Sequence, residues 1–156
     1  MSFETIPQTL PMARRDRMAV LARSNAGSLQ DLWALLGLKP GCTPLRGPES
    51  GLVMLRGRVG SSGEAFNVGE ATVTRASVKL DNGTVGHAIA LGRDREKARL
   101  CALIDALCQD VDTAARIDAE LIVPIKCELD DADEKRRRQT AATRVDFFTM
   151  VRGEDR

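Results

Sequence analysis

The sequence predicts an α+β fold: a central antiparallel sheet of about four strands with N-terminal helices, one long packed helix and a C-terminal arm, helical and then extended. Two changes in hydrophobic period support this prediction. Apolar residues recur at helical spacing over 10–36 and 93–142, and they alternate at strand spacing over 51–91. With 156 residues the chain is long enough to bury its own core, so we expect 1–156 to form a single domain.

Two helices are expected in the N-terminal part. The first begins at Pro11, just inside a Thr9 cap, and Gly27 is expected to end it. The second begins at Ser28 and ends at Gly37. Its apolar stripe consists of Leu29, Leu32, Trp33 and Leu36.

A loop and then a hairpin are expected next. Gly37–Gly51 is dense in glycine and proline and predicts the loop. Further on, Asp81–Thr84 (DNGT) is a strong hairpin signal. If Asn82-Gly83 is a two-residue loop, Val78 lies opposite His87, and the His87 side chain then points into an apolar face.

Several polar residues stand out in and beside the predicted sheet. The alternation slips near Thr74 and Arg75, which predicts a β-bulge, and bulges commonly re-aim side chains. Glu64 and Arg75, which lie around this point, are therefore candidates for contact with a ligand or a partner, and so is Arg93, which opens the long helix beside Asp94. Solvated or ion-paired side chains are the alternative.

The segment 93–142 predicts helices. Asp94 is a suitable cap for a helix whose stripe consists of Leu100, Leu103, Ile104, Leu107, Cys108 and Val111. Pro124 is expected to interrupt the next helical stretch. The charged run Asp130–Arg138 (DDADEKRRR) is typical of a helix surface that faces water.

The glycine-rich stretch around Gly57, Gly60 and Gly63 permits two interpretations. It could cradle a phosphate with backbone donors, but it lacks the G-x-G-x-x-G and G-K-[ST] patterns and no helix follows it. A hairpin loop between two strands is the favoured interpretation.

Metal and nucleophile chemistry have little support. His87 is the single histidine, and four cysteines (Cys42, Cys101, Cys108 and Cys127) show no zinc-site spacing, so no metal site is predicted. The cysteines fit buried hydrophobes in a reducing compartment.

Charge and hydropathy exclude two classes of partner. A formal charge of +1 gives no general attraction to nucleic acid, and no apolar stretch approaches the length of a membrane span. The N-terminus has the wrong order for a signal peptide, so we expect a cytoplasmic protein.

The C-terminal segment 144–153 (RVDFFTMVRG) is unusually apolar for a chain end. Arg144, Phe147 and Phe148 are its candidate contact residues. Such a segment either packs back onto the domain or docks on another subunit, because left exposed it forms an adhesive patch. We treat 144–153 as a docking tail.

Several blocks of the sequence resemble one known family. Between Gly51 and Leu107 they are GE-x-F, GEATVTRA, GRD and CALIDAL, and RVDFFTMVRG follows near the end. In this order they resemble the G subunit of bacterial carbon-phosphorus lyase, the PhnG family. The resemblance covers the chain from about Met12 to Gly153.

The resemblance implies a cytoplasmic core complex of G, H, I and J subunits that serves organic phosphonate catabolism, with K and L proteins in the same pathway. In it, the G, H, I and L proteins support transfer of the ribose triphosphate group of ATP to methylphosphonate. The products are ribose 1-methylphosphonate 5-triphosphate and adenine. The I subunit is implied to be catalytic.

The resemblance also implies where the cofactors belong. S-adenosylmethionine and a 4Fe-4S cluster serve a later radical step on the J subunit, so no cofactor is expected in this chain. The C-x3-C-x2-C cluster motif is absent from the sequence, which agrees with that expectation. No catalytic residue carries over to this subunit.

Two alternatives remain at this stage. One is a stand-alone module that binds a phosphate ligand through the Gly57–Gly63 loop and Arg75. The other is a homo-oligomeric structural protein that exchanges its tail between copies.

Overall fold

The computed structural model describes residues 12–60 and 63–143, and it has the α+β architecture that the sequence predicts. One antiparallel sheet holds the three strands of the described residues in the order β1-β2-β3, rather than about four. The strands are β1 (Cys42–Arg58), β2 (Ala65–Leu80) and β3 (Val85–Leu91). The predicted tail 144–153 lies outside the described residues.

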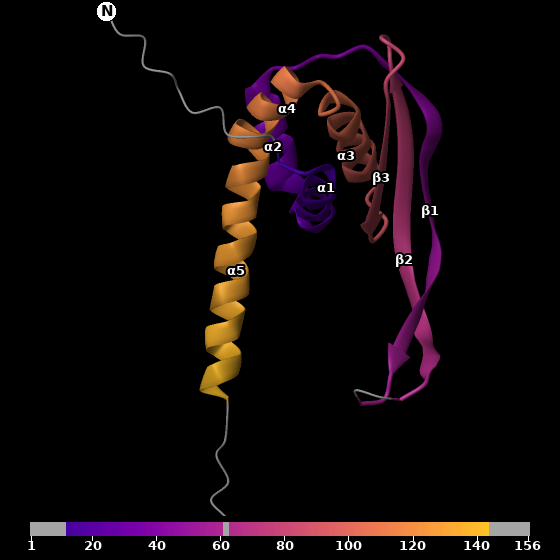
Figure 1. Cartoon of the computed structure of the whole chain (residues 1–156), viewed down its shortest axis with the longest axis vertical. Coiled ribbons are helices and arrows are strands. Elements are labelled where there is room, and N and C mark those ends of the chain that lie inside the picture. Colours follow the sequence, from indigo (N-terminus) through magenta and orange to yellow (C-terminus); the bar gives the residue numbers. More distant parts are fainter. Residues whose placement is uncertain (1–11, 61–62, 144–156) are drawn as a thin grey trace, which may run out of the picture.

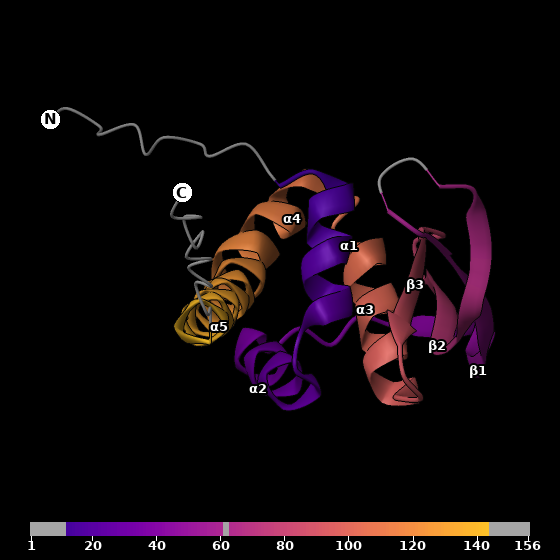
Figure 2. The same cartoon turned by 90° about the horizontal axis from the view of Figure 1, so that it is seen from below.

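The helices lie on one side of the sheet in successive layers (Figures 1 and 2). The helix α3 packs on the sheet, and α1 packs on α3. The remaining helices lie beyond α1 on the side away from the sheet. The helices are α1 (Arg14–Arg23), α2 (Ala26–Leu36), α3 (Arg95–Leu107), α4 (Val111–Ile117), the π-helix η1 (Asp118–Ile122) and α5 (Val123–Ala142).

The core between these layers is aliphatic. Its largest fully buried side chains are Leu21, Leu29, Ile104, Ile117, Leu121, Ile122 and Ile125. The close approach of α3 to β3 depends on small residues, because a Cβ added at Gly86 would overlap backbone atoms of Ala102 and Ala106. The strand β3 thus presents Gly86, Ala88 and Ala90 to the helix.

Two expectations about the helices are corrected, and a third is confirmed. Gly27 does not end the first helix; it lies inside α2, because the Asn25 side chain accepts hydrogen bonds from the Gly27 and Ser28 amides and caps that helix. Pro124 does not interrupt the helical stretch, since it lies at the start of α5, directly after the wide turn of η1. Gly37 ends α2 with a φ of 65°, as predicted.

Asp94 caps α3 as predicted, its carboxylate accepting a 2.9 Å hydrogen bond from the Lys97 amide. The run Asp130–Arg138 lies on α5 and faces solvent, with one partly covered position at Asp133. Within it, Asp133 and Glu134 form ion pairs with arginines of the same helix.

The stretch predicted as a loop between 37 and 51 is mostly strand. Two prolines, Pro44 and Pro48, are accommodated because β1 is an edge strand, and its pairing with β2 shifts register on either side of Arg46. The irregularity expected at Thr74 and Arg75 is therefore on the neighbouring strand, and β2 pairs with β3 without interruption.

The hairpin register differs from the expected one by a single residue. The turn has a three-residue loop, in which Leu80 donates to the Thr84 carbonyl and Gly83 adopts a φ of 91°. Ser77, and not Val78, therefore lies opposite His87. A slip of one residue exchanges the two faces, so His87 is exposed, and its Nδ1 lies 2.8 Å from the Ser77 hydroxyl.

Candidate functional site: an uncovered arm of the sheet

The strands β1 and β2 continue well past the end of β3. The last pair between β2 and β3 is Val73 with Leu91, whereas β1 and β2 stay paired as far as Arg58 and Ala65. Residues 51–58 and 65–72 therefore form a two-stranded ribbon, which we call the arm. It extends beyond β3 and α3 at the lower end of the sheet (Figure 1).

The arm is apolar and uncovered. Its exposed large apolar side chains have exposed fractions from 36% for Val53 to 64% for Leu52. They are Leu52, Val53, Met54, Leu55, Phe66 and Val68. Because side chains alternate along a strand, these residues lie on both faces of the ribbon. A two-stranded hairpin is marginally stable in water, and exposed patches of this kind mark interaction sites.

A depression lies where the arm meets the body, on the side of the sheet that faces the helices. We call it the notch. Its lining residues are Ser50, Gly51, Leu52, Thr72, Arg93 and Arg95. The loop that carries Arg93 is held by two hydrogen bonds: Gly92 donates to the Thr72 carbonyl at 2.9 Å and receives one at 2.7 Å from the Thr74 hydroxyl. The Thr74 side chain is almost fully buried.

The candidate residues from the sequence do not converge on one site. Arg93 lines the notch, whereas Arg75 lies on the opposite face of the sheet and pairs with Glu49 at 2.7 Å. That hydrogen bond from Arg75 is the main cause that lowers the pKa of Glu49. Glu64 is exposed at the tip of the arm. Arg144, Phe147 and Phe148 lie outside the described residues.

The Gly57–Gly63 stretch joins the two strands of the arm. Gly57 belongs to β1, and Gly60 has a φ of 68°, a conformation that turns require. No helix follows this stretch, since β2 begins at Ala65. The glycines are thus placed as the hairpin interpretation predicts.

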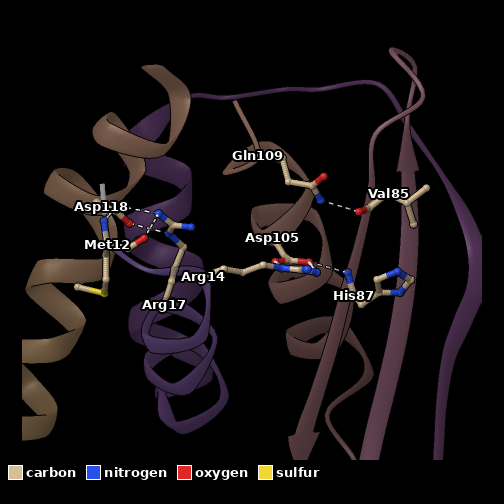
Figure 3. Close-up of polar contacts among 8 residues, drawn as sticks. All are labelled: Met12, Arg14, Arg17, Val85, His87, Asp105, Gln109 and Asp118. Atoms are coloured by element: carbon tan, nitrogen blue, oxygen red, sulfur yellow. Dashed lines mark hydrogen bonds and ion pairs between the residues drawn. The ribbon is translucent and has the colours of Figure 1, made fainter. Parts of the chain in front are cut away.

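Two ionic contacts, one buried and one partly exposed, were not predicted from the sequence. Arg17 on α1 donates two hydrogen bonds to the Asp118 carboxylate, at 2.7 and 2.8 Å, and the same carboxylate accepts from the Met12 amide (Figure 3). Arg14 makes a two-pronged contact with Asp105 on α3 at 2.8 Å, and Asp105 also accepts from the His87 amide. The feature of the sequence that could have indicated these contacts is an aspartate inside each apolar helical stretch.

These polar groups serve packing rather than reaction chemistry. Each carboxylate binds an arginine of α1 and one backbone amide, that of Met12 for Asp118 and that of His87 on β3 for Asp105. Burial raises the pKa of Cys101 to about 11 and of Cys108 to about 12, so both thiols stay protonated at neutral pH. Within residues 12–60 and 63–143, no three His, Cys, Asp or Glu side chains are grouped as metal ligands.

Comparison with known proteins shows to which family the chain belongs. The family described as "Phosphonate metabolism protein PhnG" matches residues 12–153. The chain belongs to the PhnG family. A relative from Rhizobium meliloti (strain 1021), "Alpha-D-ribose 1-methylphosphonate 5-triphosphate synthase subunit PhnG", is 51% identical over 142 residues, which cover 91% of this chain and 90% of the relative.

Membership of the PhnG family confirms the resemblance found in the sequence, and the structure shows where its blocks lie. GEATVTRA (residues 69–76) forms the base of the arm, GRD (92–94) borders the notch, and CALIDAL (101–107) is the second half of α3. Thr74 of the first block hydrogen-bonds to Gly92 of the second. No helix in the described parts of the chain has the length and apolar character needed to cross a bilayer.

Proposed function

We propose that this chain is a non-catalytic subunit of ribose 1-methylphosphonate 5-triphosphate synthase in organic phosphonate catabolism. The observation that carries the proposal is the 51% identity, over nearly the whole of both chains, with a relative named as a subunit of that synthase. A chain that matches a subunit along its full length is expected to occupy the same place in the assembly.

The character of the described surface supports a subunit role. The buried aspartates are satisfied within the fold, the Cys101 and Cys108 thiols are protonated, and the exposed His87 has one hydroxyl neighbour. The Ser77 hydroxyl lies beside the His87 imidazole, but among the described residues no third side chain is bonded to that imidazole to orient it, so a complete set of nucleophile, base and orienting group is not present there. The arm, in contrast, offers an apolar surface suited to another protein.

The proposal includes the finer reaction and its partners. With the H, I and L proteins, the chain supports transfer of the ribose triphosphate group of ATP to methylphosphonate, which releases adenine. It belongs to a core with the H, I and J subunits, and the K protein acts in the same pathway. S-adenosylmethionine and the 4Fe-4S cluster belong to a partner, and the compartment is the cytoplasm.

Reconstitution tests this function. The purified H, I and L proteins are incubated with ATP and methylphosphonate, with and without the full-length chain, and free adenine is measured by chromatography. We expect adenine release to require the chain, while the chain alone gives none. A tagged copy expressed with the H, I and J genes should recover those three proteins in a fixed ratio.

Two outcomes would overturn the proposal. Equal adenine release without the chain would remove it from the synthase, and adenine release by the chain alone would make it a catalyst. Recovery of the chain as a monomer that binds ATP would favour the stand-alone module, and recovery as a pure homo-oligomer would favour the structural alternative.

A further inference from the structure

The side of the arm that continues the helix-covered face of the sheet has no helix on it. On β2 the buried residues Thr74, Ala76 and Val78 point towards α3, and by strand alternation Thr72 and Glu70 point the same way. Their partners on β1 are Leu52 and Met54, which are 64% and 58% exposed. We call this side the inner face of the arm, and it forms one wall of the notch.

The opposite wall of the notch is positively charged. Arg93 and Arg95 flank the cap of α3, and neither forms an ion pair with an acid among the described residues. Arg99, one turn further along α3, is paired with Glu96 at 3.3 Å. The Asp94 carboxylate between them is engaged with the Lys97 amide. Cations are unfavourable at the N-terminal end of a helix. A partner's acidic group that pairs with Arg93 and Arg95 would therefore relieve an unfavourable placement in the free chain.

The charge of the notch also indicates which kind of protein segment can bind there. The residues that line the notch include two arginines and no carboxylate, so a second copy docked on the same face would bring like charges together. The segment 144–153 carries two arginines and one aspartate, a net charge of +1, and is equally unsuited. A partner with exposed carboxylates beside an apolar strip fits both walls.

We propose that the inner face of the arm, together with Arg93 and Arg95, is the docking site for a different subunit of the synthase. That subunit presents an apolar strip to Leu52 and Met54 and carboxylates to the two arginines. Arginine is enriched in interfaces because its guanidinium pairs with carboxylates in a fixed geometry, and the apolar strip excludes water from those pairs. This inference rests on the proposed function.

Site-specific photo-crosslinking tests the site. The full chain is expressed with the H, I and J proteins and carries a benzophenone amino acid at Leu52, or at Leu35 as the control. Leu35 is 82% exposed on α2, away from the arm. We expect irradiation at Leu52, and not at Leu35, to join the chain to another subunit. Mass spectrometry should then find aspartate or glutamate near the linked peptide.

Charge reversal tests the arginines. The double variant Arg93→Glu/Arg95→Glu should lower recovery of the complex at least tenfold, whereas Arg15→Glu, which changes an exposed arginine on α1, should not. Reversing the partner's acids to arginine should restore recovery to the double variant. Melting curves of the isolated variants confirm that the fold is kept.

The outcomes separate this inference from the proposed function. If the unmodified chain recovers no H, I or J protein, the proposed function fails. If it recovers them while Leu52 crosslinks to a second copy or to 144–156 of the same chain, the docking site is refuted. The docking site is also refuted if the double variant recovers the complex as well as the unmodified chain does while the isolated variant no longer binds tripolyphosphate. The notch would then be a site for small anions.

Discussion

The buried ion pair between Arg17 and Asp118 provides a quantitative test of the structure. Their side chains are 4% and 11% exposed, and Arg17 is the sole cation that contacts this carboxylate among the described residues. Arg17→Met keeps most of the volume but leaves the Asp118 charge buried with the Met12 amide as its remaining donor. Breaking such a pair costs about 3–5 kcal/mol of unfolding free energy.

For a chain of this length, each kcal/mol corresponds to roughly 2–4 °C in Tm, so Arg17→Met should lower Tm by about 6–20 °C. Thermal and urea unfolding followed by circular dichroism measure both quantities. Arg138→Met is the control, since Arg138 is 78% exposed in its pair with Glu134 and should change stability by less than about 1 kcal/mol.

The double variant Arg17→Met/Asp118→Leu separates pairing from packing. Replacing both partners with apolar residues removes the unpaired charge, so we expect it to be more stable than Arg17→Met alone. If Arg17→Met costs less than about 1 kcal/mol, or if the double variant is the less stable of the two, the reasoning about this pair is wrong.

Three further predictions follow from other parts of the structure. Gly86→Ala should lower the unfolding free energy by about 1–3 kcal/mol in urea titrations, because its methyl group overlaps the backbone of α3; Gly69→Ala, which meets no atom within 4 Å, should not have this effect. Burial raises the pKa of Cys101 and Cys108 above the ordinary value of 9.0, so their contribution to the unfolding free energy is complete below pH 9 and is lost between about pH 9 and 12. The double variant Cys101→Ala/Cys108→Ala should therefore show a smaller fall in unfolding free energy over this pH range. Amide hydrogen exchange in the arm should be fast in the isolated chain and at least tenfold slower in the assembled complex; equal rates in both would show that the arm stays uncovered.

The fold class could be predicted from hydrophobic periods, but the register of the hairpin could not. Both a two-residue and a three-residue loop fit the letters Asp81-Asn82-Gly83, and they differ in backbone angles that the sequence does not specify. In the structure Gly83 has a positive φ and Asn82 does not, which selects the longer loop. His87 consequently lies on the outer face.

The predicted bulge was wrong because one polar residue faces the core. Thr74 is 1% exposed, and its hydroxyl bonds to the Gly92 carbonyl and lies 2.9 Å from the Ser50 hydroxyl. Val73 is on the other face and is also buried, so the polar Thr74 faces the helices where an apolar residue is expected, and the pattern looks like a slipped alternation. A period of hydrophobicity cannot reveal a buried hydroxyl whose partners are distant in sequence.

Part of the candidate site was visible in the sequence. Arg93 was singled out, and the structure places it in the notch, but the apolar arm beside it could not be recognised. Residues 52–55 are a continuous apolar run, which in a sequence looks like a strand that is buried on both faces. Their exposure depends on β3 and α3 stopping short of them, which is a property of chain lengths in three dimensions.

The uncovered arm also bears on how the cell must handle this chain between synthesis and assembly. Apolar ribbons with open backbone edges are templates for aggregation, and proteins usually protect such edges with irregular pairing or proline. The upper part of β1 has that protection in Pro44, Pro48 and two register shifts, whereas 51–58 has one register shift and no proline. Chain made in excess of its partners should therefore precipitate or be degraded, so balanced production of the subunits protects this one.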